Sequence, residues 1–114
     1  MNLESERSGD TLMVRVCEPR IDAAVAVQFK DAFRAIAADA PANVVLDLQQ
    51  VDFLDSSGLG AIVAAMKLLA PNHRLELAAL SETVAKVFRL TRMDTVFTIY
   101  PDVDSAMGAA ANAT

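Results

Sequence analysis

Two adjacent serines, Ser56 and Ser57, are the residues of this sequence whose chemistry and position most clearly suggest a function. They lie within residues 44–69, which have the sequence VVLDLQQVDFLDSSGLGAIVAAMKLL. The apolar residues before the serines are typical of a buried strand, and those after them of a helix. The hydroxyls are therefore expected where the helix starts, and Ser56 is a suitable N-cap. A serine in that position could also accept a phosphate and so switch an interaction surface.

A phosphate on Ser56 would add about −1.5 to −2 charges at neutral pH. The helix dipole favours an exposed anion there by about 0.3 to 1 kcal/mol, whereas Asp55 and Asp52 would repel it. A protein partner pressed against the dianion would have to desolvate it, at a cost of about 2 to 5 kcal/mol. Gly58 and Gly60 keep side chains out of the first helical turn, so a partner could approach closely. One phosphate is therefore enough to release a bound partner.

Simpler roles exist for the same residues. Ser56 could serve only as a helix cap, and Ser57, expected at the first helical position, is the alternative phosphate acceptor. Asp55 could be an ordinary charge near a helix start, and Asp22 only the N-cap of an earlier helix. Asp47 could end its strand or bond to neighbouring backbone.

The residues do not favour catalysis. A serine nucleophile needs a base, but His73 is the only histidine and no G-x-S-x-G motif occurs. There is no Cys/His cluster for a metal and no glycine-rich loop of the G-x-x-x-x-G-K type for a nucleotide. The single cysteine, Cys17, lies in an apolar run and is expected to pack in the interior, in a reducing compartment, and a reactive thiol is the alternative. The sequence predicts a protein that is not an enzyme and holds no metal or cofactor.

The surrounding pattern predicts an α/β domain. Strands alternate with amphipathic helices in the order ββαβαβαβα, which favours a mostly parallel sheet with an antiparallel N-terminal hairpin. Asp22, Ser81 and Asp102 are expected to cap three of the helices. The expected segments are strands at 2–7 and 11–17, a helix from Asp22 to about Asp39, a strand at 44–48, a helix from Ser57 to Pro71-Asn72, a strand at 74–79, a helix after Ser81, a strand at 96–100 and a last helix after Asp102.

Length and charge restrict the classes of function. The 114 residues are 54% hydrophobic, which suits a single domain over 1–114, with a core over about 3–109 and a frayed tail at 111–114. The net charge of −5 disfavours the binding of nucleic acid, because contacts with its phosphates need a basic surface. No apolar run is long enough to insert into a membrane, and the first residues are polar, so a cytoplasmic protein is expected.

Several segments together resemble a bacterial STAS domain, in particular the stand-alone anti-sigma factor antagonists. The resemblance extends from Leu3 to about Ala109. Two positions depart from the family pattern, because Pro19 and Arg92 stand where the family usually has glycine. The segments that carry the resemblance are Ile21-Asp22, the Val44–Leu48 strand with Asp47, Asp55-Ser56-Ser57-Gly58-Leu59-Gly60, and Leu90-Thr91-x-x-Asp94.

This resemblance implies partner switching in signal transduction. Such proteins bind an anti-sigma factor that is also a serine kinase of the GHKL type, and so free a sigma factor to regulate transcription. The kinase uses its own ATP and Mg²⁺ to phosphorylate the first serine of the motif, here Ser56, after which the complex separates. A serine phosphatase removes the phosphate. The implied partner-binding residues are Asp22, Asp55, Ser56, Ser57, Gly58 and Leu59.

A second hypothesis is a constitutive STAS subunit of a transport ATPase, or of another signalling complex without a sigma factor. Such a subunit would need no phosphorylation. The two hydroxyls of Ser56 and Ser57 favour the switch, because a scaffold gains nothing evident from them.

Overall fold

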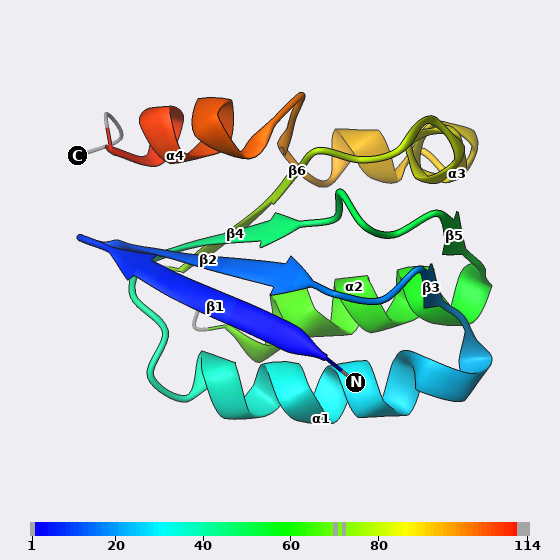
Figure 1. Ribbon diagram of the computed structural model, residues 1–114, viewed down its shortest axis with the longest axis horizontal. Helices are drawn as coiled ribbons and strands as arrows, with labels where there is room; N and C mark the ends of the chain where they lie inside the picture. Colours follow the sequence, from blue (N-terminus) through cyan, green and yellow to red (C-terminus); the bar gives the residue numbers. More distant parts are fainter. Residues whose placement is uncertain (1, 70, 72, 112–114) are drawn as a thin grey trace.

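The computed structural model describes residues 2–69, 71 and 73–111 (Figure 1). Its main sheet has five strands in the order β1-β2-β4-β6-β7. The β1–β2 pair is antiparallel, and the other three pairs are parallel. The predicted α/β fold with an N-terminal hairpin is therefore confirmed. The five strands are β1 (Leu3–Ser8), β2 (Thr11–Val16), β4 (Asn43–Asp47), β6 (Arg74–Ala78) and β7 (Ile99–Tyr100).

Helices lie on both sides of this sheet (Figure 1). Helices α1 (Ala23–Ala37) and α2 (Ser56–Leu68) pack against each other below it, and α4 (Val103–Ala111) contacts β2, β4, β6 and β7 on the other side. Helix α3 (Glu82–Leu90) lies on the same side as α4 but further right in Figure 1, where it contacts β5 (Phe53–Leu54). The N-termini of α1 and α2 meet at this right-hand end of the molecule.

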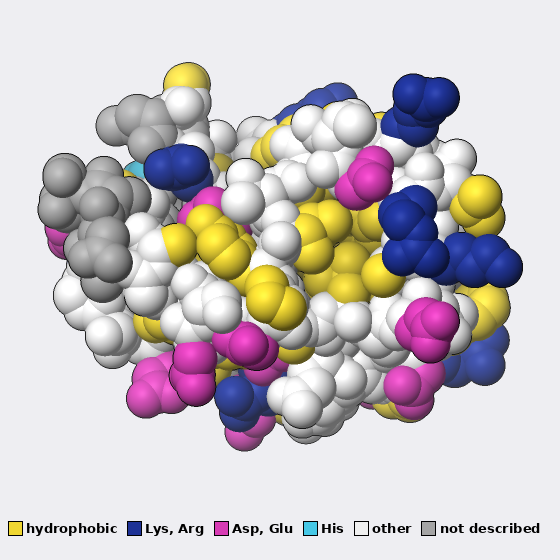
Figure 2. Space-filling view, turned by 90° about the horizontal axis from the view of Figure 1, so that it is seen from above, with side chains coloured by type: hydrophobic (Ala, Val, Ile, Leu, Met, Phe, Trp, Pro, Cys, Tyr) yellow, Lys and Arg dark blue, Asp and Glu magenta, His cyan; other side chains and the backbone are white. Residues whose placement is uncertain are grey.

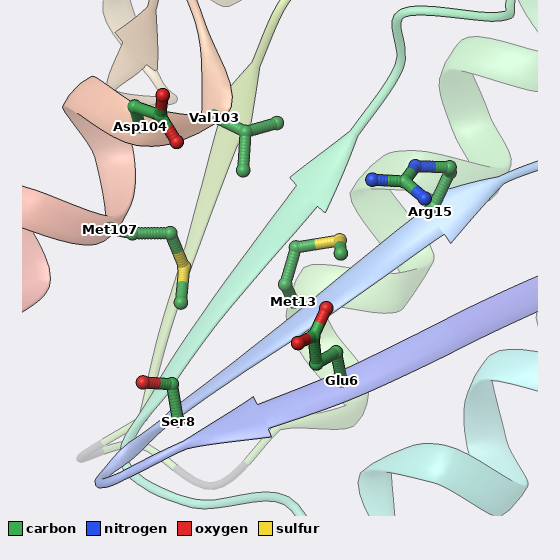
Figure 3. Close-up of a pocket in the computed structure, with 7 residues that line it drawn as sticks. All are labelled: Glu6, Ser8, Met13, Arg15, Val103, Asp104 and Met107. Atoms are coloured by element: carbon green, nitrogen blue, oxygen red, sulfur yellow. The ribbon is translucent and has the colours of Figure 1, made fainter.

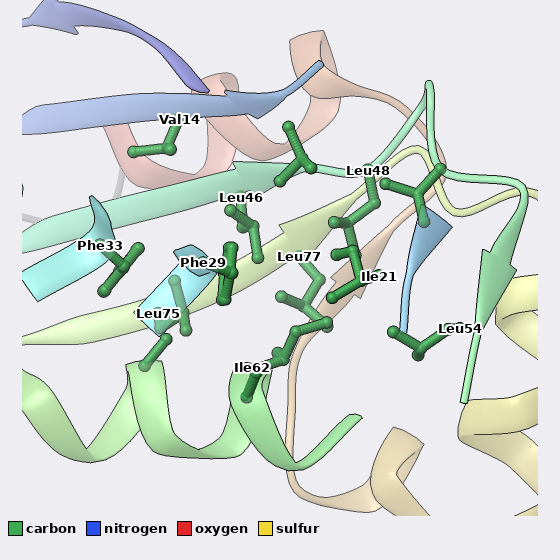
Figure 4. Close-up of a cluster of buried hydrophobic side chains, with 14 of the residues drawn as sticks. Val14, Ile21, Phe29, Phe33, Leu46, Leu48, Leu54, Ile62, Leu75 and Leu77 are labelled. Atoms are coloured by element: carbon green, nitrogen blue, oxygen red, sulfur yellow. The ribbon is translucent and has the colours of Figure 1, made fainter. Parts of the chain in front are cut away.

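The main core lies between the sheet and helices α1 and α2 (Figure 4). Alternate residues of the central strands point into it, as expected for a sheet whose side chains have a period of two. Phe29 and Phe33 from α1 and Ile62 from α2 fill the space opposite them, and all three are completely buried. Burying each such side chain stabilises the fold by about 1.5 to 3 kcal/mol. The strand residues facing them are Val14, Val16, Val44, Leu46, Leu75 and Leu77.

The other face of the sheet has a small apolar cluster and an ion pair whose carboxylate is buried. Val45 and Ala78 pack against Ala106 of α4. Beside them, Asp47 is fully buried, and its Oδ2 lies 2.9 Å from Nε of Arg15. The pKa of the Arg15 guanidinium is raised, chiefly by this hydrogen bond. The buried carboxylate of Asp47 is thus paired with a positive charge, as a buried charge must be.

Most predicted boundaries agree with the structure within two residues. Helix α1 ends at Ala37 rather than near Asp39, and the last strand begins at Ile99 instead of residue 96. That strand is shorter because a 3₁₀ helix, η1 (Met93–Thr95), precedes it. Ser81 and Asp102 accept hydrogen bonds from the N–H groups of Val84 and Ser105, as predicted for caps. Residues 70, 72 and 112–114, which include part of the predicted helix stop and of the tail, lie outside the described residues.

The sequence did not predict two very short strands. β3 (Arg20–Ile21) and β5 pair in parallel as a separate two-stranded sheet. Two residues are too few to show an alternating pattern. Among the described residues, no helix is long and apolar enough to cross a membrane.

Cys17 differs from its prediction as an interior residue. It is half-buried just beyond β2, and its thiol donates a hydrogen bond to Oε1 of Glu4 at 3.1 Å. This hydrogen bond raises the pKa of the Cys17 thiol. The prediction failed because alternation along β2 places residue 17 on the polar face with Arg15, rather than on the core face with Val16.

We expect Glu4→Gln to speed the alkylation of Cys17 by iodoacetamide at pH 8. Removing the carboxylate lowers the thiol pKa, and the thiolate is the reactive form. The rate follows from the loss of free thiol over time. Glu6→Gln, on the same strand, serves as the control and should leave the rate unchanged. A rate that is unchanged or slower in Glu4→Gln would contradict the role given to Glu4.

Candidate functional site

Ser56 and Ser57 are the first two residues of α2, and both side chains are exposed. Strand β4 leads to them through β5, so the serines follow the carboxyl end of a central strand. Functional residues of open α/β sheets gather at this end. The structure therefore confirms that two accessible hydroxyls stand where a helix begins.

The N-cap of α2 is Asp55, which corrects the prediction that Ser56 caps this helix. Oδ1 of Asp55 accepts a hydrogen bond from the Gly58 N–H at 2.9 Å, and its backbone is extended, as at an N-cap. Ser56 is the first helical residue and Ser57 the second. Because Asp55 does the capping, the Ser56 hydroxyl is not needed to start the helix.

Asp55 also joins the starts of two helices. Its Oδ2 accepts a hydrogen bond from the N–H of Ala23, the first residue of α1, at 3.2 Å. Asp22 caps α1 as predicted, since its Oδ1 accepts from the Ala24 N–H at 3.1 Å. The structure thus brings the predicted residues Asp22, Asp55 and Ser56 together at one end of the molecule.

Asp55→Ala is expected to destabilise the protein by about 1 to 2 kcal/mol, the range for loss of an N-cap. Asp55→Asn should retain only part of the stability, because its one carbonyl oxygen can cap α2 but its NH2 group cannot accept from the Ala23 N–H. Urea unfolding followed by circular dichroism gives both values. The exposed Asp52 offers a control, and Asp52→Ala should change the stability by less than about 0.5 kcal/mol. Equal stability of Asp55→Ala and wild type would contradict the capping role.

Gly58 has a structural role within the chain. It is buried, and a Cβ added to it would lie 1.9 Å from the carbonyl oxygen of Ile21 in β3. Gly60 is exposed, and a Cβ there would meet nothing within 4 Å. Leu59 is half-buried and packs against the core. Of these two glycines, Gly60 leaves open space on the surface and Gly58 does not. Contact of Gly58 or Leu59 with a partner stays a prediction.

Arg20 and Phe53 belong to the same end of the molecule, although sequence reasoning missed them. Arg20 Nε lies 3.2 Å from Oδ2 of Asp22, and its guanidinium stacks 4.5 Å from the centre of the Phe53 ring. Phe53 remains 38% exposed. No sequence pattern pointed to them, because their contact depends on the pairing of β3 with β5.

Two shallow hollows lie beside α4, away from the serines. One, of about 320 Å³, is lined by apolar Met13, Val103 and Met107 together with the carboxylates Glu6 and Asp104 (Figure 3). The other, of about 350 Å³, includes Asp47 and Asp102. Hydrogen bonds from Ser105 lower the pKa of Asp102. In the described part of the chain, no group of three or more His, Cys, Asp or Glu could hold a metal ion.

The sequence matches the family model of the STAS domain over residues 2–106. This match spans most of the chain. The protein therefore belongs to the STAS domain family.

Solved structures with the same fold come from two kinds of protein. An anti-sigma factor antagonist from Mycobacterium paratuberculosis is 30% identical, with a TM-score of 0.85 over 95% of this chain and 92% of that one. The anti-sigma factor antagonist SpoIIAA, from Bacillus, is 21% identical in its unphosphorylated form, with a TM-score of 0.79 over 97% of both chains. A sulfate transporter family protein from Wolinella succinogenes is 14% identical, with a TM-score of 0.77 over 90% of this chain and 85% of that one.

Proposed function

We propose that this protein is an anti-sigma factor antagonist that is switched by phosphorylation of Ser56. Unphosphorylated, it binds an anti-sigma serine kinase of the GHKL type and keeps that kinase from its sigma factor. Phosphorylated, it releases the kinase, and a serine phosphatase restores binding. The ATP and Mg²⁺ belong to the kinase, so the chain itself needs no cofactor and acts in the cytoplasm beside its partners.

The observation that carries this proposal is the exposed Ser56 hydroxyl, which the fold does not use. Asp55 caps α2 instead, so Ser56 can be modified without removing the cap. The carboxylate of Asp55 directly precedes Ser56. It accepts a hydrogen bond from the N–H of Ala23, so Asp22, the residue before Ala23, also lies close to the site. The dianion would add repulsion to an already acidic surface, and a docked protein would have to desolvate it.

The comparisons support the same proposal. The relative that is 30% identical is an anti-sigma factor antagonist. SpoIIAA, which shares the fold, has been solved in both unphosphorylated and phosphorylated forms.

A second candidate is a constitutive STAS subunit of a transport complex, because the sulfate transporter family protein shares the fold. Such a subunit would bind its complex without modification. It offers no use for the exposed hydroxyl of Ser56, so the switch is the better supported function.

Phosphorylation itself provides the test. The purified chain is incubated with ATP, Mg²⁺ and each GHKL-type serine kinase encoded in the same genome, and its intact mass is then measured. A gain of about 80 Da, the mass of one phosphate ester, is expected for the wild type and Ser57→Ala but not for Ser56→Ala. A gain that persists in Ser56→Ala and disappears in Ser57→Ala would place the site on Ser57. No gain with any kinase would favour the constitutive subunit.

A further inference from the structure

An exposed basic and apolar surface lies next to the serine site, on α3 and the residues that follow it. Spacings of three and four residues place Lys86, Arg89 and Leu90 on one exposed side of α3. Leu90 is 74% exposed, and Val96, just beyond η1, is 49% exposed. We call Lys86, Arg89, Leu90, Arg92 and Val96 the α3 surface. Large side chains that remain exposed together are typical of protein interaction sites.

The α3 surface is positive in an otherwise acidic protein. Residues 82–96 contain three basic and two acidic side chains, whereas the whole chain carries a charge of −5. Within the described chain, neither Glu82 nor Asp94 forms an ion pair with the basic side chains of this surface. In Figure 2, basic side chains gather over the right-hand end, where α3 lies in Figure 1. The guanidinium and ammonium groups are thus available to an acidic partner.

Arg92 has a backbone conformation that costs stability. Its φ is 60° and its ψ is 20°, the left-handed region, which glycine adopts more easily than any other residue. Ala79, with φ 61°, shows that such strain alone does not indicate a function. Arg92 differs from Ala79 because it carries an exposed, unpaired charge at the end of α3. Arg92 therefore places a charged side chain on the α3 surface at a position where glycine would cost less stability.

Helix α3 lies beside the segment that leads to the serine site. Strand β5 contacts α3, and its Phe53 lies three positions before Ser56 in the chain. Arg20 links Phe53 to Asp22, which caps α1. A protein that covers Ser56 can therefore reach α3 without leaving the surface of this end of the molecule.

We propose that the α3 surface docks an acidic segment of the protein partner, with carboxylates facing Lys86, Arg89 and Arg92 and an apolar side chain against Leu90. This inference rests on the proposed function insofar as the partner is the kinase that acts on Ser56. Complementary charge speeds and orients docking, and the apolar contact retains the partner. The charge of α3 then selects which kinase reaches the serine.

The first test uses the affinity of the kinase for the unphosphorylated chain. Lys86→Glu/Arg89→Glu should weaken binding at least about 10-fold, and more at low salt. The matched control is Lys30→Glu/Arg34→Glu on α1. It changes the net charge of the protein by the same amount and should leave the affinity within about twofold of the wild type. If the α3 variant bound as tightly as the wild type and the kinase still phosphorylated it on Ser56, the docking role of the α3 surface would be wrong, while the proposed switch would stand.

Arg92 gives a second, independent test. Arg92→Gly and Ala79→Gly each relieve a left-handed residue, so both should raise the melting temperature, by about 4 °C. Only Arg92→Gly should also weaken kinase binding, because only it removes a charge from the α3 surface. Unchanged affinity in Arg92→Gly would show that the guanidinium is not used.

The surface can also be tested without any kinase. The ¹⁵N-labelled chain is titrated with a synthetic peptide of alternating glutamate and leucine, or with the matching lysine–leucine peptide. The acidic peptide alone should shift the amide resonances of residues 82–97 and Phe53. Shifts from both peptides alike, from neither, or on α4 would overturn the proposal, whatever happens at Ser56. Sedimentation of the chain alone would show whether it self-associates. If it does, and Lys86→Glu/Arg89→Glu abolishes that association, a second copy of the chain occupies the α3 surface instead.

Discussion

Ser56→Asp is expected to weaken binding of the partner kinase at least about 30-fold, whereas Ser56→Ala should bind as the wild type does. The aspartate places a permanent charge on the first residue of α2, directly after Asp55. Covering that charge with a partner costs about 2 kcal/mol or more, which corresponds to this factor in affinity. Isothermal titration with the purified kinase in the absence of ATP measures the affinity of each variant.

Ser105→Asp is the matched control for this substitution. Ser105 is also an exposed serine in the first turn of a helix, but it belongs to α4, away from the serine site. The Ser105→Asp variant should bind the kinase with wild-type affinity. If Ser105→Asp weakened binding as much as Ser56→Asp, total charge rather than its position would control the complex.

Gly58→Ala is expected to destabilise the fold by about 3 kcal/mol or more, or to prevent folding. The added methyl group would meet the backbone oxygen of Ile21, and a backbone atom cannot rotate away as a side chain can. The first turn of α2 would have to move off β3, which separates Asp55 from the N–H of Ala23. Overpacking of this kind commonly costs about 1 to 3 kcal/mol, and more when backbone is involved. Thermal and urea unfolding give the loss.

Gly60→Ala, two residues further along the same helix, is its control. A Cβ at this position meets nothing within 4 Å, so the change should stabilise the protein by about 0.5 to 1 kcal/mol through helix propensity. Equal stabilities of the two alanine variants would show that α2 does not depend on its close approach to β3.

The sheet and the helices that cover it were predictable because their signals are repetitive. Alternating apolar residues in β2 and helical spacing in α1 each repeat over many positions, so errors at single residues do not matter. The caps Asp22, Ser81 and Asp102 were also predictable, because each is a good capping residue that directly precedes a clear helical pattern. Boundaries such as the end of α1 depend on single hydrogen bonds and were less accurate.

The errors concern contacts between segments distant in the sequence. Both Asp55 and Ser56 are good caps, and only the structure shows that Asp55 takes this role while also bonding to Ala23. Arg15 and Asp47 pair because β2 lies beside β4, which no local pattern reveals. The burial of Gly58 likewise depends on the position of Ile21.

The positions of Ser56, Ser57 and the nearby aspartates at a helix start were predictable, but the extent of the candidate site was not. The pair Ser56-Ser57 and the aspartates were recognised by residue type and spacing. Arg20 and Phe53 join them through the β3–β5 pair, which is too short to be detected. The basic side of α3 could not be recognised from the sequence, since its exposure together with the left-handed Arg92 appears only in three dimensions.

The most direct measurement follows the affinity of one kinase complex through a full cycle of modification. The chain is titrated with the kinase before phosphorylation, after complete phosphorylation of Ser56, and again after a serine phosphatase has removed the phosphate. We expect the affinity to fall at least about 30-fold on phosphorylation and to return to its first value afterwards. The same affinity in all three states would contradict the switch and leave only the fold of a binding domain.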